Sequence, residues 1–110
     1  MTIPTLGQSG YPPAGQQFFA DYAQRYGESE PNSFAIYGYE VGRLILDVLE
    51  RASDPTDRGS VREALFQTID RDSVLGTYSI DANGDTTLTT YGVYGIESGV
   101  LAFERAVGGG

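Results

Sequence analysis

The chain of 110 residues contains no cysteine and no histidine, and all seven of its basic residues are arginine, so lysine is absent as well. Without these residues there is no thiolate nucleophile, no imidazole base, no amine for a Schiff base and no disulfide. Carboxylates and hydroxyls remain, and a pair of carboxylates can hydrolyse glycosides. Such sites usually sit in deep clefts, however, and a chain this short has little room for one. We therefore predict that the protein is not an enzyme.

Positive charge is scarce too. The formal net charge is −8, and the arginines are scattered from Arg25 to Arg105. Partners rich in phosphate need clustered cations, so nucleic acid and anionic membrane are not expected partners. No apolar run approaches the roughly 20 residues of a spanning helix. The first residues, MTIPTLGQSG, lack the basic start and apolar stretch of a secretory signal. If the intact protein is exported, we expect its signal to lie outside this chain.

Periodicity divides the chain into a leader and one partial lobe. Scattered proline and glycine predict irregular backbone over residues 1–14. Helical spacing follows, with Gly27 as a stop signal, and after about residue 70 the apolar period changes from 3.6 to 2. The segment alone is expected to be α+β, with three helices followed by a small antiparallel β-meander. The predicted elements are helices over 15–26, 33–52 and 58–69, strands over 75–80, 90–97 and 100–106, and a flexible tail over 108–110.

The strongest helical pattern lies in EPNSFAIYGYEVGRLILDVLERAS. Asn32 or Ser33 can cap its start. Gly38 and Gly42 lie inside it, where glycine costs about 1 kcal/mol relative to alanine. We expect close backbone packing against a neighbouring element to offset this cost. The apolar residues that recur on one face are Tyr37, Val41, Leu44, Ile45, Val48, Leu49 and Ala52.

The stretch DANGD, residues 81–85, resembles the first half of a calcium loop because its oxygen-bearing side chains alternate. A loop of the EF-hand type needs an acid at position 12, which here is Gly92, and a glycine at position 6, which here is Thr86. The flanking segments also read as strands. We therefore predict no metal site, but a type I′ turn at Asn83-Gly84 in which Asp81 and Asp85 accept bonds from nearby backbone N–H groups.

The ordered series of features resembles a known family. The series runs from the aromatic helix FFADYAQRYG through PNSFAIYGYEVGRLILDVLERA and SVREALFQT to VLGTYSIDANGDTTLTTYGVYGIE. It is similar to the C-terminal third of periplasmic (type I) solute-binding proteins of the leucine/isoleucine/valine-binding family of ABC transporters. The resemblance implies Rossmann-like α/β lobes joined by hinge crossings, an amino acid held in the cleft, an ABC permease as partner, and no cofactor. It also implies a periplasmic or extracellular location, lipid- or cell-surface-associated.

The resemblance implies a ligand contact from the aromatic residue just before the long helix, which here is Phe34. Tyr37, one helical turn on, can reach the same cleft. Both residues also have structural interpretations, because Phe34 fits a hydrophobic staple at a helix start and Tyr37 fits the core. The resemblance also implies that the main contacts to the ligand's ammonium and carboxylate groups come largely from a region that this chain does not contain.

Two functional hypotheses follow. In the first, the chain is part of a receptor for branched-chain amino acids or related solutes. In the second, it is a stand-alone interaction or structural domain without a small ligand. A carboxylate hydrolase is a third interpretation, but the spacing of Asp70, Asp72 and Asp81 indicates only a solvated loop.

Self-association is expected if the chain is part of a larger receptor. If the helices are shaped to rest on neighbours that the chain does not encode, their apolar faces lack cover. Each buried aliphatic side chain is worth roughly 1.5–3 kcal/mol, and a small domain has only about 5–15 kcal/mol of stability. We therefore expect a homo-oligomer, a homodimer that buries Leu44, Ile45, Val48 and Leu49.

Overall fold

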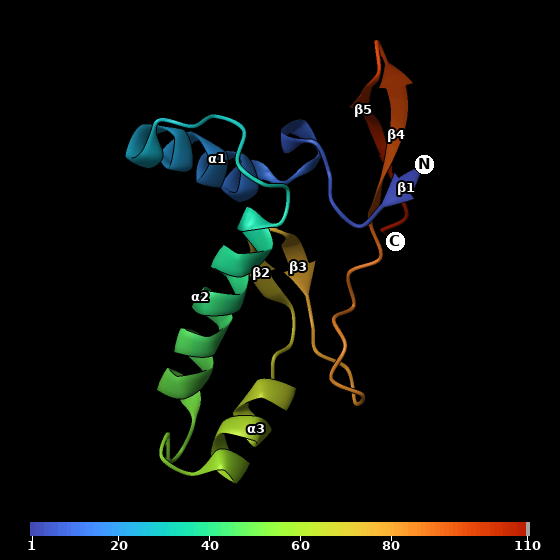
Figure 1. Cartoon of the computed structure of the whole chain (residues 1–110). Helices are drawn as coiled ribbons and strands as arrows, with labels where there is room; N and C mark the ends of the chain where they lie inside the picture. The colour runs from blue at the N-terminus through green and yellow to red at the C-terminus, as the bar shows by residue number, and fades with distance from the viewer. Residues whose placement is uncertain (110) are drawn as a thin grey trace.

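The computed structural model describes residues 1–109 and contains three α-helices and two small antiparallel sheets (Figure 1). This agrees with the α+β class expected for the segment. The helices are α1 (Pro13–Tyr26), α2 (Ala35–Arg51) and α3 (Arg58–Phe66), with a short 3-10 helix η1 (Gln8–Gly10). The strands are β1 (Thr2–Ile3), β2 (Arg71–Ser73), β3 (Gly76–Tyr78), β4 (Tyr91–Glu97) and β5 (Val100–Val107).

The strands do not form the single meander that was predicted. β2 and β3 make one hairpin, whereas β1, β4 and β5 make a separate sheet in the order β1-β4-β5. The hairpin is tight because the hydroxyl of Ser73 donates to the carbonyl of Gly76 and accepts from the N–H of Leu75. In Figure 1 the hairpin lies against α2, and the three-stranded sheet stands at the far end of the molecule with both termini.

The leader is more ordered than predicted. β1 pairs with β4, with Thr2 opposite Val93 and Ile3 opposite Gly92. α1 already begins at Pro13, whose fixed φ suits the first helical position. At the other end of α1, Gly27 takes a left-handed φ of 71° and ends the helix as expected. A two-residue strand is too short to produce a periodic signal, so the sequence pattern could not reveal β1.

Two other boundaries differ from the prediction. α3 ends at Phe66 rather than residue 69, and Ile69 is exposed rather than part of an apolar helix face. The predicted tail over 108–110 lies partly outside the described residues. Within them, the N–H of Gly109 donates to the hydroxyl of Thr89.

The core is small. It is centred on Tyr11, Phe19 and Ile36, and half-buried side chains from α1, α2 and the β2–β3 turn pack against it. The radius of gyration is 15.9 Å, whereas a compact domain of this length would have about 13 Å. The molecule measures 53 × 32 × 21 Å, so it is elongated rather than closed around one interior.

α2 is apolar on two sides, and residues 1–109 cover only one of them. Its buried residues are Ile36, Glu40 and Val48. Val41, Ile45, Leu46 and Leu49, which we call the α2 stripe, are exposed by 38–63%. Of the residues placed on the apolar face from the sequence, only Val48 is buried, which agrees with the expectation that this face lacks cover within the chain.

The two glycines of α2 do not serve close packing within the described part of the chain. A side-chain carbon added at Gly38 or Gly42 would meet no atom within 4 Å. Both glycines are exposed, and they lie three or four residues from members of the α2 stripe. The expected close neighbour is therefore not part of residues 1–109.

The DANGD segment is a turn, but not of type I′. The N–H of Gly84 donates to the carbonyl of Asp81, and the Asp81 carboxylate accepts from the N–H groups of Asn83 and Asp85. Gly84 has a positive φ of 89°, whereas Asn83 does not. The aspartate therefore sets the turn, and Asp85 contributes its backbone carbonyl, which accepts from the N–H of Asp81.

Two findings on special environments concern residues 1–109. They contain no group of three or more acidic side chains placed to hold a metal ion. None of their helices has the length and apolar character needed to cross a membrane.

Candidate functional site

Phe34 and Tyr37, the two predicted ligand contacts, lie side by side at the start of α2. Phe34 is the residue before the first helical turn, and its N–H donates to the side-chain oxygen of Asn32. The rings of Phe34 and Tyr37 are 6.0 Å apart. Phe34 is 58% exposed. A hydrophobic staple would cover this ring, so its exposure favours a surface role.

Tyr37 is held from two directions. Its ring packs against the core, as the structural interpretation of this residue expects. Its hydroxyl donates to the carbonyl of Pro4 at 2.6 Å. Burial raises the pKa of Tyr37 to about 12, so the hydroxyl stays protonated and remains a donor at neutral pH.

Two more tyrosine hydroxyls contact the same stretch of backbone. Tyr94 donates to the carbonyl of Thr5 at 3.2 Å, and Tyr11 accepts from the N–H of Leu6 at 3.1 Å. Burial also raises the pKa of Tyr11. Sequence periodicity could not reveal this arrangement, because Tyr94 and Thr5 are 89 residues apart.

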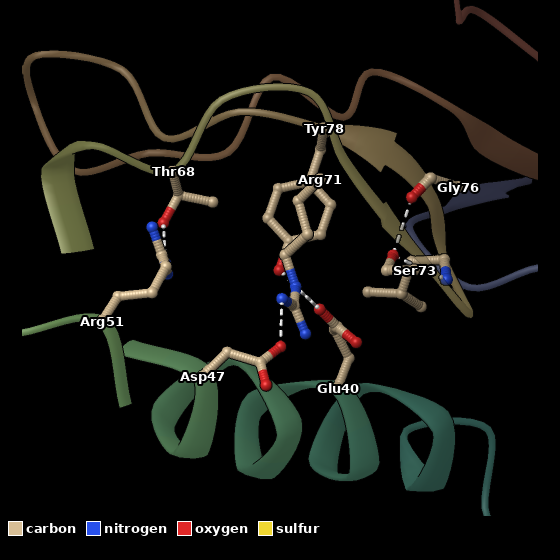
Figure 2. A network of polar contacts seen from close by, with 9 residues as sticks. Glu40, Asp47, Arg51, Thr68, Arg71, Ser73, Gly76 and Tyr78 are labelled. Carbon is tan, nitrogen blue, oxygen red and sulfur yellow. Dashed lines mark hydrogen bonds and ion pairs between the residues drawn. The ribbon is translucent and has the colours of Figure 1, made fainter. Parts of the chain in front are cut away.

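A second polar cluster joins α2 to the β2–β3 hairpin (Figure 2). The carboxylate of Glu40 accepts from Nε of Arg71 at 2.6 Å and from the hydroxyl of Tyr78 at 2.7 Å. Arg71 also donates to Asp47 at 2.5 Å. Glu40 and Tyr78 are buried. A little further along α2, Arg51 donates to the hydroxyl of Thr68.

The hydrogen bonds of this cluster shift the pKa values of its members in directions that keep Asp47 and Arg71 charged and Tyr78 neutral. The hydrogen bond from Arg71 lowers the pKa of Asp47. Burial opposes the charge on Arg71, but its bonds to Glu40 and Asp47 raise its pKa overall. Burial and the bond to Glu40 raise the pKa of Tyr78. The donors and acceptors satisfy one another, so the cluster fastens the hairpin to α2.

Several grooves mark the surface formed by residues 1–109, and the two with mainly apolar linings contain neither Phe34 nor Tyr37. One, of about 550 Å³, runs along α1 and is lined by the aromatic rings of Phe18, Tyr22, Tyr26 and Tyr39, together with polar residues. The other, of about 340 Å³, lies between α2 and α3 and is lined by Ile45, Val48, Val61 and Leu65 with Arg58 and Arg62.

The sequence pattern of the periplasmic binding protein family matches residues 5–100. The chain belongs to this family. No curated protein matches the chain closely enough to count as a relative.

Solved structures place this periplasmic binding protein in the type I fold. The leucine binding protein LivK from Thermotoga maritima matches with a TM-score of 0.78 and 27% identity over 96% of the chain. An ABC transporter substrate-binding protein from Desulfitobacterium hafniense, in complex with Leu, matches with a TM-score of 0.77 and 22% identity over 91%. The branched-chain amino acid transporter substrate-binding protein LivJ from Streptococcus pneumoniae, in complex with isoleucine, matches with a TM-score of 0.77 and 23% identity over 96% of the chain.

The chain spans 29% of the length of each of these three proteins. The resemblance stated from the motifs is therefore confirmed for the family and the fold. The small core and the exposed α2 stripe therefore belong to a chain that spans less than a third of each solved structure it matches.

Sequence reasoning missed Glu40 and Arg71, the residues that hold the hairpin in this member of the family. Glu40 lies within the stretch PNSFAIYGYEVGRLILDVLERA, one of the segments that carry the family resemblance. No local signal marks Glu40, because only the structure shows that it shares a buried helix face with Ile36, where a charge requires a partner.

Proposed function

We propose that the chain is the C-terminal portion of the solute-binding component of an ABC importer. The solute is a branched-chain amino acid or a related molecule, and it is bound and released without chemical change, so no catalysis or cofactor is involved. The observation that supports this most is the match of 96% of the chain to leucine- and isoleucine-binding structures. The residue inventory agrees, since histidine, cysteine and lysine are absent.

Phe34 contributes an apolar surface to the ligand's side chain. Its ring is exposed although it precedes a well-packed helix. Burying a ring of this size against an aliphatic ligand is favourable by roughly 1.5–3 kcal/mol. Tyr37 stands behind it, with its hydroxyl already bonded to Pro4, so it supports the ring of Phe34 and contacts the ligand with its edge.

The intact protein acts outside the cytoplasmic membrane, in the periplasm or attached to the cell surface, and delivers its solute to an ABC permease. The membership in the periplasmic binding protein family supports the location. The net charge of −8 and the dispersed arginines argue against nucleic acid as a partner.

A chimera tests this function. The segment of Thermotoga maritima LivK that this chain matches is replaced by the chain, and leucine binding is measured by titration calorimetry. We expect the chimera to bind leucine, and Phe34→Ala in it to weaken binding at least about tenfold, equivalent to about 1.4 kcal/mol. Tyr26→Ala, which removes an exposed ring at the end of α1, is the matched control and keeps the affinity.

A folded chimera that binds none of leucine, isoleucine and valine would contradict the proposal. The 110-residue chain alone is expected to bind leucine weakly or not at all, because it spans only 29% of the binding proteins it matches. Calorimetry on the isolated chain therefore serves as the baseline for the chimera.

The second candidate is a stand-alone interaction domain, and the α2 stripe favours it. Four exposed aliphatic side chains on one helix form an apolar patch of the kind that marks an interface. We propose that copies of the chain associate through this stripe. The interface residues differ from those first predicted, since Val48 is buried and Leu44 half-buried within one copy.

A further inference from the structure

Three tyrosines from three different elements bind three consecutive residues of one connecting segment. Residues 4–6 lead from β1 toward η1, and they receive the hydroxyls of Tyr37 from α2, Tyr94 from β4 and Tyr11 from the loop before α1. We call these contacts the tyrosine clamp. Connecting segments usually run over the surface, whereas each residue of this one has a backbone group bonded to a tyrosine hydroxyl, from nearby in the sequence for Leu6 and from distant elements for Pro4 and Thr5.

The segment between β1 and η1 leads from the three-stranded sheet to the helical part of the chain (Figure 1). Thr5 is 1% exposed, and its hydroxyl has no hydrogen-bond partner among residues 1–109. The backbone of β4 lies close to Thr5, because a side-chain carbon added at Gly92 would come within 2.4 Å of the Thr5 carbonyl oxygen. The burial of Thr5 shows that the two parts are packed tightly around the segment.

Tyr37 differs from the other two tyrosines in what else it contacts. Its hydroxyl bonds to Pro4 of the clamped segment, and its ring lies 6.0 Å from the exposed ring of Phe34. A shift of the Phe34 ring therefore reaches the segment through one side chain.

We infer that Tyr37 is a positioning residue that fixes the orientation of the β1-β4-β5 sheet relative to the helical part and links that orientation to Phe34. The link to a ligand rests on the proposed function. The fixing of the orientation does not, because it follows from the hydrogen bond to Pro4 and the packing around Thr5.

Distance measurement between two spin labels tests the inference. The chain has no native cysteine, so labels attach only at introduced ones. Ser53→Cys, after α2, and Glu97→Cys, at the end of β4, place one label on each part, and both positions are exposed. The labelled chain is diluted with unlabelled chain, so that contacts between copies do not contribute.

We expect one narrow distance distribution in the parent and a distribution at least about twice as wide in Tyr37→Phe, which removes only the hydroxyl. Tyr39→Phe is the matched control. It alters the same group two residues on, where the ring packs on Phe18 rather than on the clamped segment, and we expect the parental width. An unchanged width in Tyr37→Phe would overturn the inference.

Circular dichroism verifies that each variant is folded. If Tyr37→Phe fails to fold, Tyr94→Phe breaks the neighbouring bond to Thr5 and is expected to widen the distribution in the same way, and an unchanged width there overturns the inference. The measurement uses no ligand. A chimera that fails to bind leucine therefore contradicts the proposed function alone, and an unchanged width contradicts the clamp alone.

Discussion

Glu40 and Arg71 form the one ion pair within residues 1–109 in which both side chains are largely withdrawn from water, with 2.6 Å between the carboxylate and Nε. The pair joins two segments that are 31 residues apart. Tyr78 donates to the same carboxylate oxygen. Because a buried charge is costly without partners, each member of this group holds the others in place, and the β2–β3 hairpin is held on α2.

Removing the cation leaves Glu40 buried without its main partner. Arg71→Met is expected to lower the free energy of unfolding by roughly 3 kcal/mol, near the lower end of what the loss of one partner of a buried pair costs, because Arg71 keeps some solvent contact. Urea unfolding followed by circular dichroism measures this. Arg43→Met, at an exposed site on the same helix, is the control and should cost less than about 0.5 kcal/mol.

The double variant Glu40→Gln with Arg71→Met separates charge from shape. Neutralising the carboxylate removes the unpaired buried charge, so we expect the double variant to be more stable than Arg71→Met alone. Equal or lower stability of the double variant would mean that the pair contributes packing rather than charge compensation.

Alkaline pH tests the burial of Tyr37. Its pKa is about 12 in the folded chain, against an ordinary value of 10.0. Below about pH 10 the side chain is neutral in both states. Between about pH 10 and 12 the unfolded chain releases the proton and the folded chain keeps it, so stability falls as pH rises through this window.

The urea midpoint should therefore fall across this window, and it should fall less in Tyr37→Phe, which has no proton to lose. Some slope remains in that variant, because burial also raises the pKa of Tyr11 and Tyr78. Tyr26→Phe, at an exposed ring, should keep the parental slope. Identical slopes for the parent and Tyr37→Phe would argue that Tyr37 is open to water.

Local chemistry predicted some helix ends and missed others. Gly27 ends α1 with a left-handed φ, as expected, whereas neither Asn32 nor Ser33 caps α2, whose start has no side-chain cap. Motifs in a fixed order also indicated the family. These features depend on a few neighbouring residues, so one chain carries the whole signal.

The buried side of α2 could not be predicted, because the helix is apolar on both sides and the buried side centres on the charged Glu40. A periodicity argument places a charged residue on the solvent side of a helix. Glu40 is instead buried because Arg71, which is distant in the sequence, pairs with it. The tyrosine clamp was missed for a related reason, since it joins residue 5 to residue 94. Phe34 and Tyr37 as ligand contacts stay predictions.

Asp81 controls the turn between the hairpin and β4. Its carboxylate accepts two backbone N–H groups, so Asp81→Ala should lower the free energy of unfolding by about 1–2 kcal/mol. Asp85→Ala keeps the backbone carbonyl that closes the turn and should cost less. Adding calcium should not raise the melting temperature, because residues 1–109 contain no group of three acidic side chains placed to hold a metal ion. A calcium-dependent rise that disappears in Asp81→Ala would contradict this.

The α2 stripe predicts association of the chain with itself. Four aliphatic side chains of the stripe are 38–63% exposed. Burying them in a dimer is favourable, because each square ångström of apolar surface removed from water contributes roughly 25 cal/mol. We expect light scattering to show a dimer at high micromolar concentration. Ile45→Glu with Leu49→Glu should give a monomer, because the dimer would have to bury four carboxylates. Ile96→Glu, at an exposed position on β4, is the matched control and should remain dimeric. A folded parental monomer would mean that the stripe needs a partner other than a second copy.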